Sequence, residues 1–263
     1  MELYRYYPGL YPVVVNVPHA GTQIPPHLKS RFTDTAAHLP DTDWYVDRLY
    51  NFTRDMGIHL LVAANSRYVV DLNRNREEEV LYPGCFNTSV LPMQTFTKEP
   101  IYREGREPST RESQERISAY WQPYHNKLLR ILRFCIERYG KVVLFDAHSI
   151  KSEVPSLFDG QLPALNIGTA GGNSANTELT DKVFHLCQSS SYSSTLNGRF
   201  KGGYITRTYG KPAAGCHVIQ LEMTQQCYMS ETAPYDYSHE KAADMQRQVL
   251  HPLMETLIDW AQQ

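Results

Sequence analysis

The segment KVVLFDAHSI, from Lys141 to Ile150, changes within a few residues from apolar to polar. Its first half, 142–145, is a short run of β-branched, aromatic and other apolar residues, which is typical of a strand buried on both faces of a sheet. The run ends in the polar stretch 146–149, and open α/β sheets place their chemistry at the carboxyl ends of strands. The segment therefore predicts an α/β fold in which His148 either binds a metal, oriented by a nearby carboxylate, or is a satisfied structural histidine.

A second apolar run, Val13 to Val17, has the same form. It stops at Pro18-His19-Ala20-Gly21, where proline suits the end of a strand because it cannot donate to the sheet. His19 therefore occupies the same position on its strand as His148 does on the central one. Two such histidines on strands that could be neighbours favour a shared metal site.

Two aspartates follow in the sequence PDTDW, at positions 41 and 43. Either aspartate can cap a helix that we expect to run to about Met56 and to stop at Gly57. The functional alternative is that one carboxylate completes a metal site with His19 and His148. Two imidazoles and one carboxylate suit zinc with an open position for water.

An arginine follows the second of two further predicted strands. The segment 58–64 is expected to be a strand, and Tyr68 to Val70 a third strand that ends in the sequence DLNRN. Arg74, beside Asn73, suits a carboxylate or an oxyanion, because a guanidinium can donate two parallel hydrogen bonds. The alternative for Arg74 is a surface salt bridge with Glu77–Glu79, a run that we expect to form a solvated turn.

Glycines surround three cations in the stretch 197–207, which reads NGRFKGGYITR. They would let Arg199, Lys201 or Arg207 approach an anionic ligand closely, and Arg207 is the favoured ligand residue; the alternative is a basic hairpin on the surface. The last predicted strand, 216–222, ends in Glu222. A buried carboxylate is costly without a partner or a task, which makes Glu222 a candidate general base.

The remaining patterns complete an α/β order. We expect 80–105 to form a wall or lid of the pocket, with Tyr102 and Arg103 as weaker candidates for substrate contacts. Helices are expected at 109–139, with a capping box of Ser109 and Glu112, at 178–187, and at 239–261, and a short strand at 165–168. Pro123 should kink or split the first of these helices, Pro252 should break or kink the last, and His125 should be structural or lie at the surface. Without internal repeats or linkers, residues 1–263 are predicted to form a single domain.

Composition excludes several classes of protein. The chain has 263 residues, of which 41% are hydrophobic and 21% charged, so it can form a globular core. A net charge of −2 argues against nucleic acid or an anionic membrane as partner, and no apolar run is long enough to span a bilayer. The first residues do not form a secretory signal. Five cysteines, with no C-x-x-C pair, indicate reduced thiols and a cytoplasmic protein; the oligomeric state stays open.

Taken together, these motifs resemble a known family. PHAG at 18–21, DTDW at 41–44, DLNR at 71–74, DAHS at 146–149, FKGGYITR at 200–207 and QLE at 220–222 are similar to the N-formylglutamate amidohydrolase (deformylase) family, over nearly the whole chain. The resemblance implies hydrolysis of N-formyl-L-glutamate to formate and L-glutamate in histidine degradation. It also implies the three-layer fold of zinc carboxypeptidases and aspartoacylases, a mixed, mostly parallel sheet flanked by helices.

The resemblance implies roles for particular residues. His19 and His148 would bind one Zn²⁺; Thr22 stands where the relatives have a ligating glutamate, so the third ligand is placed at Asp43, with Asp41 as the alternative. Glu222 matches the catalytic glutamate, and zinc together with Arg74 would stabilise the oxyanion. The substrate is a small acidic N-acyl amino acid, and the residues expected to bind it are Asn73, Arg74, Arg207 and Tyr204, with Arg67 and Arg199 in reserve. The alternatives are a metalloamidase or exopeptidase for another N-acyl amino acid, and a non-catalytic binder of an acidic ligand.

Overall fold

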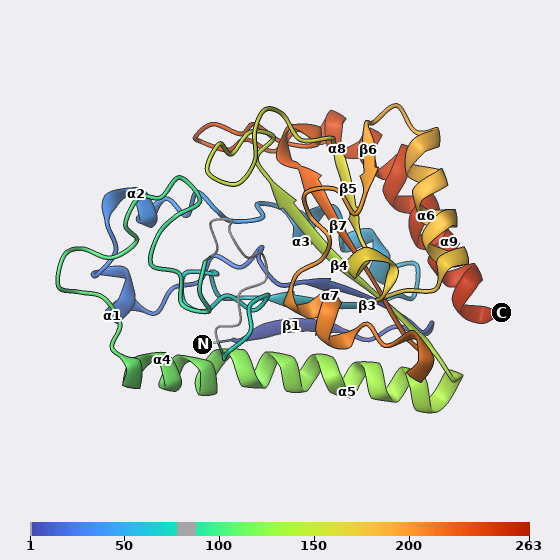
Figure 1. The fold of residues 1–263 in the computed structure, drawn as a ribbon, viewed down its shortest axis with the longest axis horizontal. Helices are drawn as coiled ribbons and strands as arrows, with labels where there is room; N and C mark the ends of the chain where they lie inside the picture. Colours follow the sequence, from blue (N-terminus) through green and yellow to red (C-terminus); the bar gives the residue numbers. More distant parts are fainter. Residues whose placement is uncertain (1, 78–87) are drawn as a thin grey trace.

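A seven-stranded sheet forms the middle of the molecule, in the order β1-β3-β2-β4-β7-β5-β6 (Figure 1). The computed structural model describes residues 2–77 and 88–263. The strands are β1 (Tyr4–Tyr7), β2 (Val13–Val17), β3 (His59–Ala63), β4 (Val142–Ile150), β5 (Leu165–Gly168), β6 (Ser194–Leu196) and β7 (Cys216–Thr224). Four of the six pairings are parallel, and β1–β3 and β5–β7 are antiparallel. The predicted mixed, mostly parallel sheet is confirmed.

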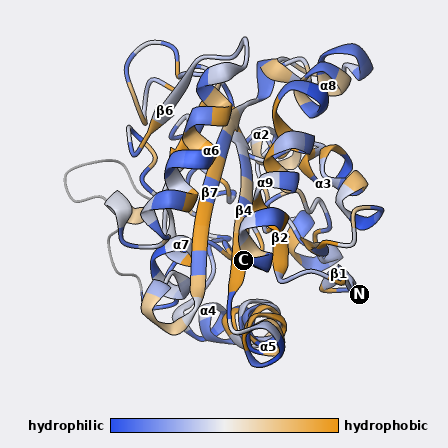
Figure 2. Ribbon diagram, turned by 90° about the vertical axis from the view of Figure 1, so that its right-hand side faces the viewer, coloured by the Kyte–Doolittle hydropathy of each residue, from blue (hydrophilic) through white to orange (hydrophobic). Residues whose placement is uncertain are grey.

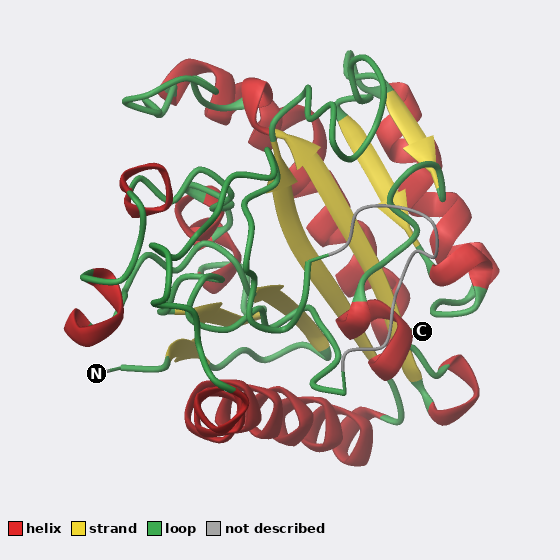
Figure 3. Ribbon diagram, turned by 60° about the vertical axis from the view of Figure 1, so that its left-hand side comes forward, coloured by secondary structure: helices red, strands yellow, loops and turns green. Residues whose placement is uncertain are grey.

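The two longest strands, β4 and β7, lie side by side in the centre of the sheet (Figure 3). Both have nine residues, and all of them are buried. The prediction that the central strand ends at Asp146 is wrong, because β4 continues to Ile150. The reason is that β7 supplies partners along the whole length, with His148 opposite Glu222. The polar half of the segment is therefore paired and buried in the sheet like the apolar half.

Helices cover both faces of the sheet, which gives the three layers that were predicted (Figure 1). Val142, Leu144 and Val218 pack with α5 (Gln122–Tyr139) on one face. The residues between them, Val143 and Phe145, pack on the other face in a core that includes α6 (Thr177–Ser189) and α9 (His251–Gln262). Figure 2 shows the central strands as largely hydrophobic. This burial on both faces explains the continuous apolar runs in the sequence.

Each of the two long helices that contain Pro123 and Pro252 is divided by a π-helical segment. Ser109 caps α4 (Thr110–Arg116) and accepts a hydrogen bond from the Glu112 N–H. A π-helical segment, Ile117–Trp121, then leads into α5, which has Pro123 in its first turn and ends at Gly140. The same arrangement joins α8 (His239–Met245) through Gln246–Leu250 to α9, with Pro252 in the first turn. Proline has no N–H to donate to the preceding turn, and the wider π turn accommodates that loss.

Two predicted elements are wrong. The helix expected from PDTDW to Met56 is instead the single turn α3 (Val46–Leu49) and a 3₁₀ turn at Asn51–Arg54, and neither aspartate caps α3. The positive φ of 62° at Tyr45 breaks any longer helix before it starts. The strand expected at 68–70 is a turn, in which the Val69 N–H donates to the Ser66 carbonyl. Tyr68 and Val69 are buried there because they pack against distant parts of the chain. Their apolar side chains therefore look like those of a buried strand in the sequence.

The other short elements shape the loops. They are α1 (Pro26–Lys29), α2 (Asp34–Ala37), α7 (Tyr204–Tyr209) and three 3₁₀ turns at Ala170–Gly172, Pro212–Ala214 and Gln225–Cys227. Helix α7 takes the place of the alternative basic hairpin. The predicted wall or lid, 80–105, and the run Glu77–Glu79 lie partly outside the described residues, and Cys85 lies wholly outside them. The four described cysteines are free and buried, and no helix in the described part of the chain is long and apolar enough to cross a bilayer.

Candidate active site

One face of the central strands changes from apolar to polar along its length. Val14, Leu144 and Val218 start this face, in the core beneath α5. Because side chains two residues apart share a face of a strand, the next residues on it are polar. They are Asn16, Asp146, His148, Gln220 and Glu222, all buried. The sheet thus presents a row of polar groups at the carboxyl ends of β2, β4 and β7, as expected for an α/β site.

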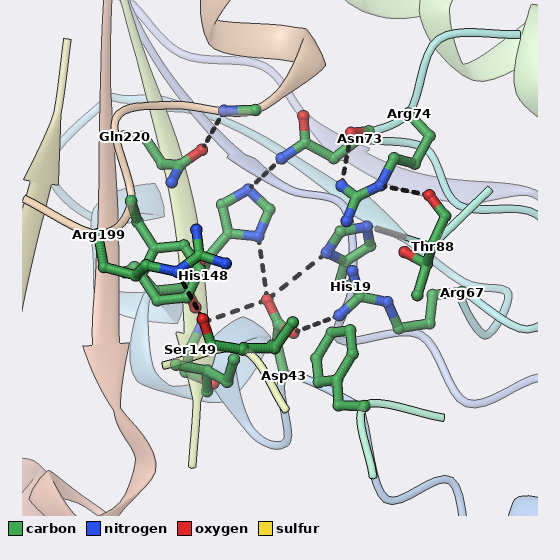
Figure 4. Close-up of a pocket in the computed structure, with 16 residues that line it drawn as sticks. His19, Asp43, Arg67, Asn73, Arg74, Thr88, His148, Ser149, Arg199 and Gln220 are labelled. Atoms are coloured by element: carbon green, nitrogen blue, oxygen red, sulfur yellow. Dashed lines mark hydrogen bonds and ion pairs between the residues drawn. The ribbon is translucent and has the colours of Figure 1, made fainter. Parts of the chain in front are cut away.

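His19, Asp43 and His148 form a compact group at this place (Figure 4). One ligand atom from each lies within 4.8 Å of the others. The Asp43 Oδ2 is 3.1 Å from the His148 Nδ1 and 3.8 Å from the His19 Nδ1. The Asp43 N–H also donates to the His19 carbonyl, which ties the loop after α2 to the end of β2. Two imidazole nitrogens and a carboxylate oxygen, all buried, are a donor set that fits zinc.

Carboxylates hold the opposite nitrogen of each imidazole. The His19 Nε2 lies 2.8 Å from the Asp71 Oδ1, and Arg67 holds Asp71 at 3.0 Å. The His148 Nε2 lies 3.1 Å from the Asp146 Oδ2, close enough for an ion pair although outside hydrogen-bond geometry. Both Nδ1 atoms therefore face Asp43, in the arrangement that orients metal-binding histidines. The sequence analysis missed Asp71; its place in the same stretch as Arg74 was the available signal.

Asp41, the alternative third ligand, is engaged elsewhere. Its Oδ2 accepts hydrogen bonds from the Tyr68 hydroxyl at 2.6 Å and from the Phe96 N–H at 2.9 Å. Burial raises the pKa of the Asp41 carboxyl. Asp43 is instead held toward the histidines by the Ser149 N–H at 3.2 Å. The geometry therefore favours Asp43.

Burial and neighbouring charges shift the pKa values of this group. Burial and Arg67 lower the pKa of His19. Burial would also lower the pKa of His148, but Asp146 and Asp43 raise it well above its ordinary value. Burial opposes ionisation of Asp43, yet the two histidines hold its pKa below the ordinary value. Asp43 is therefore ionised and ready to bind a cation.

Glu222 lies beside this group, and its carboxyl has no hydrogen-bond or ion-pair partner within residues 2–77 and 88–263, where Asn166 binds only its backbone carbonyl. It lines the pocket and is 9% exposed. Burial raises its pKa to about 8, against the opposing charge of His148. A carboxyl with a pKa near neutrality can both take and return a proton. A buried carboxylate without a partner is costly for folding, so it points to a task in the pocket.

Three arginines line the pocket, which encloses about 660 Å³ including solvent at its mouth. Arg67 contacts the Asp43 carboxylate at 3.6 Å. The Arg74 Nε donates to the Thr88 carbonyl at 3.0 Å, and the Arg199 Nε donates to the Leu157 carbonyl at 2.7 Å. These bonds hold two guanidinium groups at the wall of the pocket (Figure 4). The concentration of positive charge suits a small anion with more than one carboxylate.

Other predicted substrate contacts lie elsewhere. Arg207 is exposed on α7, where its Nε donates to the Gly202 carbonyl at 2.9 Å, and Tyr204 packs toward Trp121. Neither residue is among the described residues that line the pocket. The same holds for Tyr102, which is buried in a separate core cluster, and for Arg103, which donates to the Phe32 carbonyl. The structure thus brings Arg67, Arg74 and Arg199 to the pocket and leaves Arg207 outside it.

Asn73 lines the pocket, but its amide is already used. Its Oδ1 accepts the Ile205 N–H at 2.8 Å, and its Nδ2 lies 3.1 Å from the His148 Nε2. Asn73 therefore connects α7 with the histidine of β4. His125, predicted to be structural or at the surface, lies on α5 and is buried, and its Nε2 donates to the Leu72 carbonyl at 2.9 Å.

Comparisons with known proteins agree with this geometry. Residues 11–229 match the family described as N-formylglutamate amidohydrolase. An N-formylglutamate deformylase of Pseudomonas putida is 40% identical over 98% of this chain and 97% of its own length. Another, from Pseudomonas aeruginosa, is 40% identical over 100% and 98%. A crystal structure of N-formylglutamate amidohydrolase from Ralstonia eutropha shares the fold, with a TM-score of 0.82, 23% identity and coverage of 99% and 97% of the two chains. A gene product of Agrobacterium tumefaciens does so with a TM-score of 0.74 and 19% identity over 100% and 97%.

Proposed function

The chain belongs to the N-formylglutamate amidohydrolase family, and from this premise we propose that it hydrolyses N-formyl-L-glutamate to formate and L-glutamate with one bound zinc ion. It is accordingly a hydrolase acting on a linear amide. The observation that carries the proposal is the buried Glu222 carboxyl, which has no partner among the described residues, beside the group formed by His19, Asp43 and His148. A role in histidine degradation and a cytoplasmic location belong to the same proposal.

The metal would be held by the Nδ1 atoms of His19 and His148 and by a carboxylate oxygen of Asp43. Asp71 and Asp146 keep the two imidazoles turned toward it. A zinc ion at such a site acts as a Lewis acid and brings the pKa of water to about 7. The ligand set has two neutral donors and one carboxylate, so the site keeps a net positive charge that attracts the anionic substrate.

Glu222 carries the proton through the reaction. Its carboxylate takes a proton from the attacking water as the water oxygen bonds to the formyl carbon. The C–N bond then breaks, and Glu222 returns the proton to the leaving nitrogen, which releases formate and L-glutamate. The raised pKa of Glu222 suits both transfers, because neither the charged nor the neutral form is strongly disfavoured near neutral pH.

The arginines bind the two carboxylates of the substrate. Arg74 and Arg199 reach the pocket from different segments, so they can hold groups that are several bonds apart. Arg74 lines the same pocket as the metal-binding group, and the proposal gives it a share in stabilising the oxyanion, as predicted from the sequence. Phe96, Ile150 and Leu157 provide an apolar wall for the methylene groups of the substrate.

The test is the release of L-glutamate from N-formyl-, N-acetyl- and peptidyl-glutamate by the purified, metal-analysed protein, with formate measured as the second product of the formyl substrate. The proposal predicts a clear preference for the formyl substrate and an activity that a chelator removes and zinc restores. A preference for the acetyl or peptidyl substrate would indicate the alternative metalloamidase or exopeptidase. Binding of the substrate without turnover in the zinc-loaded protein would indicate a non-catalytic binder.

A further inference from the structure

Gln220 is a polar residue of the pocket to which the mechanism assigns no function. It lies on β7, two residues before Glu222 and on the same face. It lines the pocket and is 3% exposed. A buried amide needs hydrogen-bond partners for both its oxygen and its nitrogen, so the partners of Gln220 show what it can still bind.

The orientation of the Gln220 amide is set by the backbone. Its Oε1 accepts a hydrogen bond from the Gly203 N–H at 2.9 Å (Figure 4). Only the oxygen of an amide can accept from an N–H, so the nitrogen must lie on the opposite side. Position 203 cannot move away easily, since even an added Cβ would lie 2.4 Å from the Asn73 Nδ2. The loop before α7 therefore holds the Gln220 amide in one orientation.

The Gln220 Nε2 is left for a ligand. In the described part of the chain, the hydrogen bonds of the Gln220 side chain go to its oxygen, from Gly203 and at 3.5 Å from the Thr206 hydroxyl. Asn73, the other amide of the pocket, differs because both of its ends are engaged. Gln220 thus offers two N–H donors in a pocket that otherwise carries guanidinium groups. Such donors bind an acceptor, and a carboxylate is the strongest acceptor that the proposed substrate brings.

Position along the strand separates Gln220 from the reacting carbon. Glu222 is opposite His148 in the sheet, whereas Gln220 is opposite Asp146, two residues nearer the amino end of each strand. Two residues along a strand correspond to about 6.6 Å. Because His148 and Glu222 mark the scissile amide, Gln220 lies beside the glutamyl part of the substrate. Resting on the proposed function, we propose that Gln220 is a specificity-determining residue whose amide N–H groups bind a carboxylate of the glutamyl part, and not the oxyanion.

Two variants test the donor. Gln220→Met removes it, whereas Gln220→Glu keeps an oxygen for the Gly203 N–H and replaces the donor by an oxygen. Each should raise KM for N-formylglutamate about 10- to 100-fold, the worth of one hydrogen bond to a charged group, while kcat and zinc content stay close to wild type. Thr206→Val is the matched control, since it alters the other contact to Oε1 and leaves the donor in place. The control should keep the wild-type KM.

Substrate analogues identify the carboxylate. N-formylglutamine lacks the charge of the side chain, and N-formyl-4-aminobutyrate lacks the α-carboxylate. The penalty of Gln220→Met should disappear for one of them and persist for the other. An equal penalty for all three substrates, a loss in kcat alone, or the same rise in KM in Thr206→Val would overturn the assignment.

Calorimetric binding of L-glutamate, the product, separates this inference from the proposed function. If the wild type binds L-glutamate and Gln220→Met binds it at least 10-fold more weakly, Gln220 binds a carboxylate even in a protein that does not turn over N-formylglutamate. Equal affinity of the two proteins for L-glutamate would overturn the role of Gln220, whether or not the wild type hydrolyses N-formylglutamate.

Discussion

Replacing Glu222 by glutamine separates catalysis from folding and metal binding. Glutamine keeps the size of the side chain and one acceptor oxygen, but it cannot take a proton near neutral pH. The Glu222 carboxyl has no hydrogen-bond partner within the described residues, so the substitution breaks no side-chain contact there that holds the fold. We expect Glu222→Gln to retain zinc and substrate binding and to lose a factor of about 10²–10⁴ in kcat, the usual contribution of a general acid–base group.

The same variant should fold at least as stably as the wild type. Burial raises the pKa of Glu222 from 4.5 to about 8, so the folded protein prefers the protonated carboxyl. Between these values the folded state binds more protons than the unfolded state, and stability therefore falls as pH rises. Each pKa unit corresponds to about 1.4 kcal/mol, so the charged form opposes folding by several kcal/mol above pH 8. Glutamine cannot ionise, so the variant does not carry this cost of burying a charge.

Three measurements check the prediction: kcat and KM for N-formylglutamate, zinc by elemental analysis, and urea unfolding of chelator-treated protein at pH 5 and pH 8. The loss of stability from pH 5 to pH 8 should be smaller in Glu222→Gln than in the wild type. Near-normal turnover would show that Glu222 is a structural carboxylate, and loss of zinc would make it a ligand. In the first case the base would have to be sought among Asp41, Asp43 and Asp146.

Three further outcomes follow from the same geometry. Asp43→Ala should lower zinc occupancy and abolish turnover, whereas Asp41→Ala should keep the metal; elemental analysis decides, and the reverse result would move the third ligand to Asp41. Arg199→Met should weaken substrate binding by roughly 2–5 kcal/mol with zinc content unchanged, and Arg207→Met, outside the pocket, should bind as the wild type; titration of both with L-glutamate would reject the assignment if their effects were interchanged. Burial lowers the pKa of His125 to about 4, so its contribution to stability is present above about pH 6.5 and is lost as pH falls toward 4. His125→Gln should therefore flatten the dependence of the urea-unfolding free energy on pH between these values. An unchanged slope would contradict this expectation.

Local patterns in the sequence were sufficient to predict most of the scaffold. The runs that became β2, β4 and β7 are continuous and apolar because both faces of these strands are buried, and this needs no knowledge of their neighbours. The interruptions of regular α-helix before Pro123 and Pro252 agree with the missing N–H of proline, which is a local property. The polar residues at the ends of these runs predicted the place of the site for the same reason, since a buried polar group needs a partner or a task.

Only the tertiary structure could choose between residues of equal chemistry. Asp41 and Asp43 are two residues apart and both buried, yet Tyr68 and Phe96 bind the first and His148 the second. The pairing of His19 with Asp71 joins residues 52 positions apart, through a turn that the sequence suggested was a strand.

Arg199 and Arg207 show the same limit of local patterns. Both lie in one glycine-rich stretch, and the short helix α7 turns Arg207 toward solvent while Arg199 stays at the pocket. Periodicity and composition report how the backbone folds locally and which side chains are buried. They do not report which distant loop supplies the partner, because that depends on how the segments pack against one another.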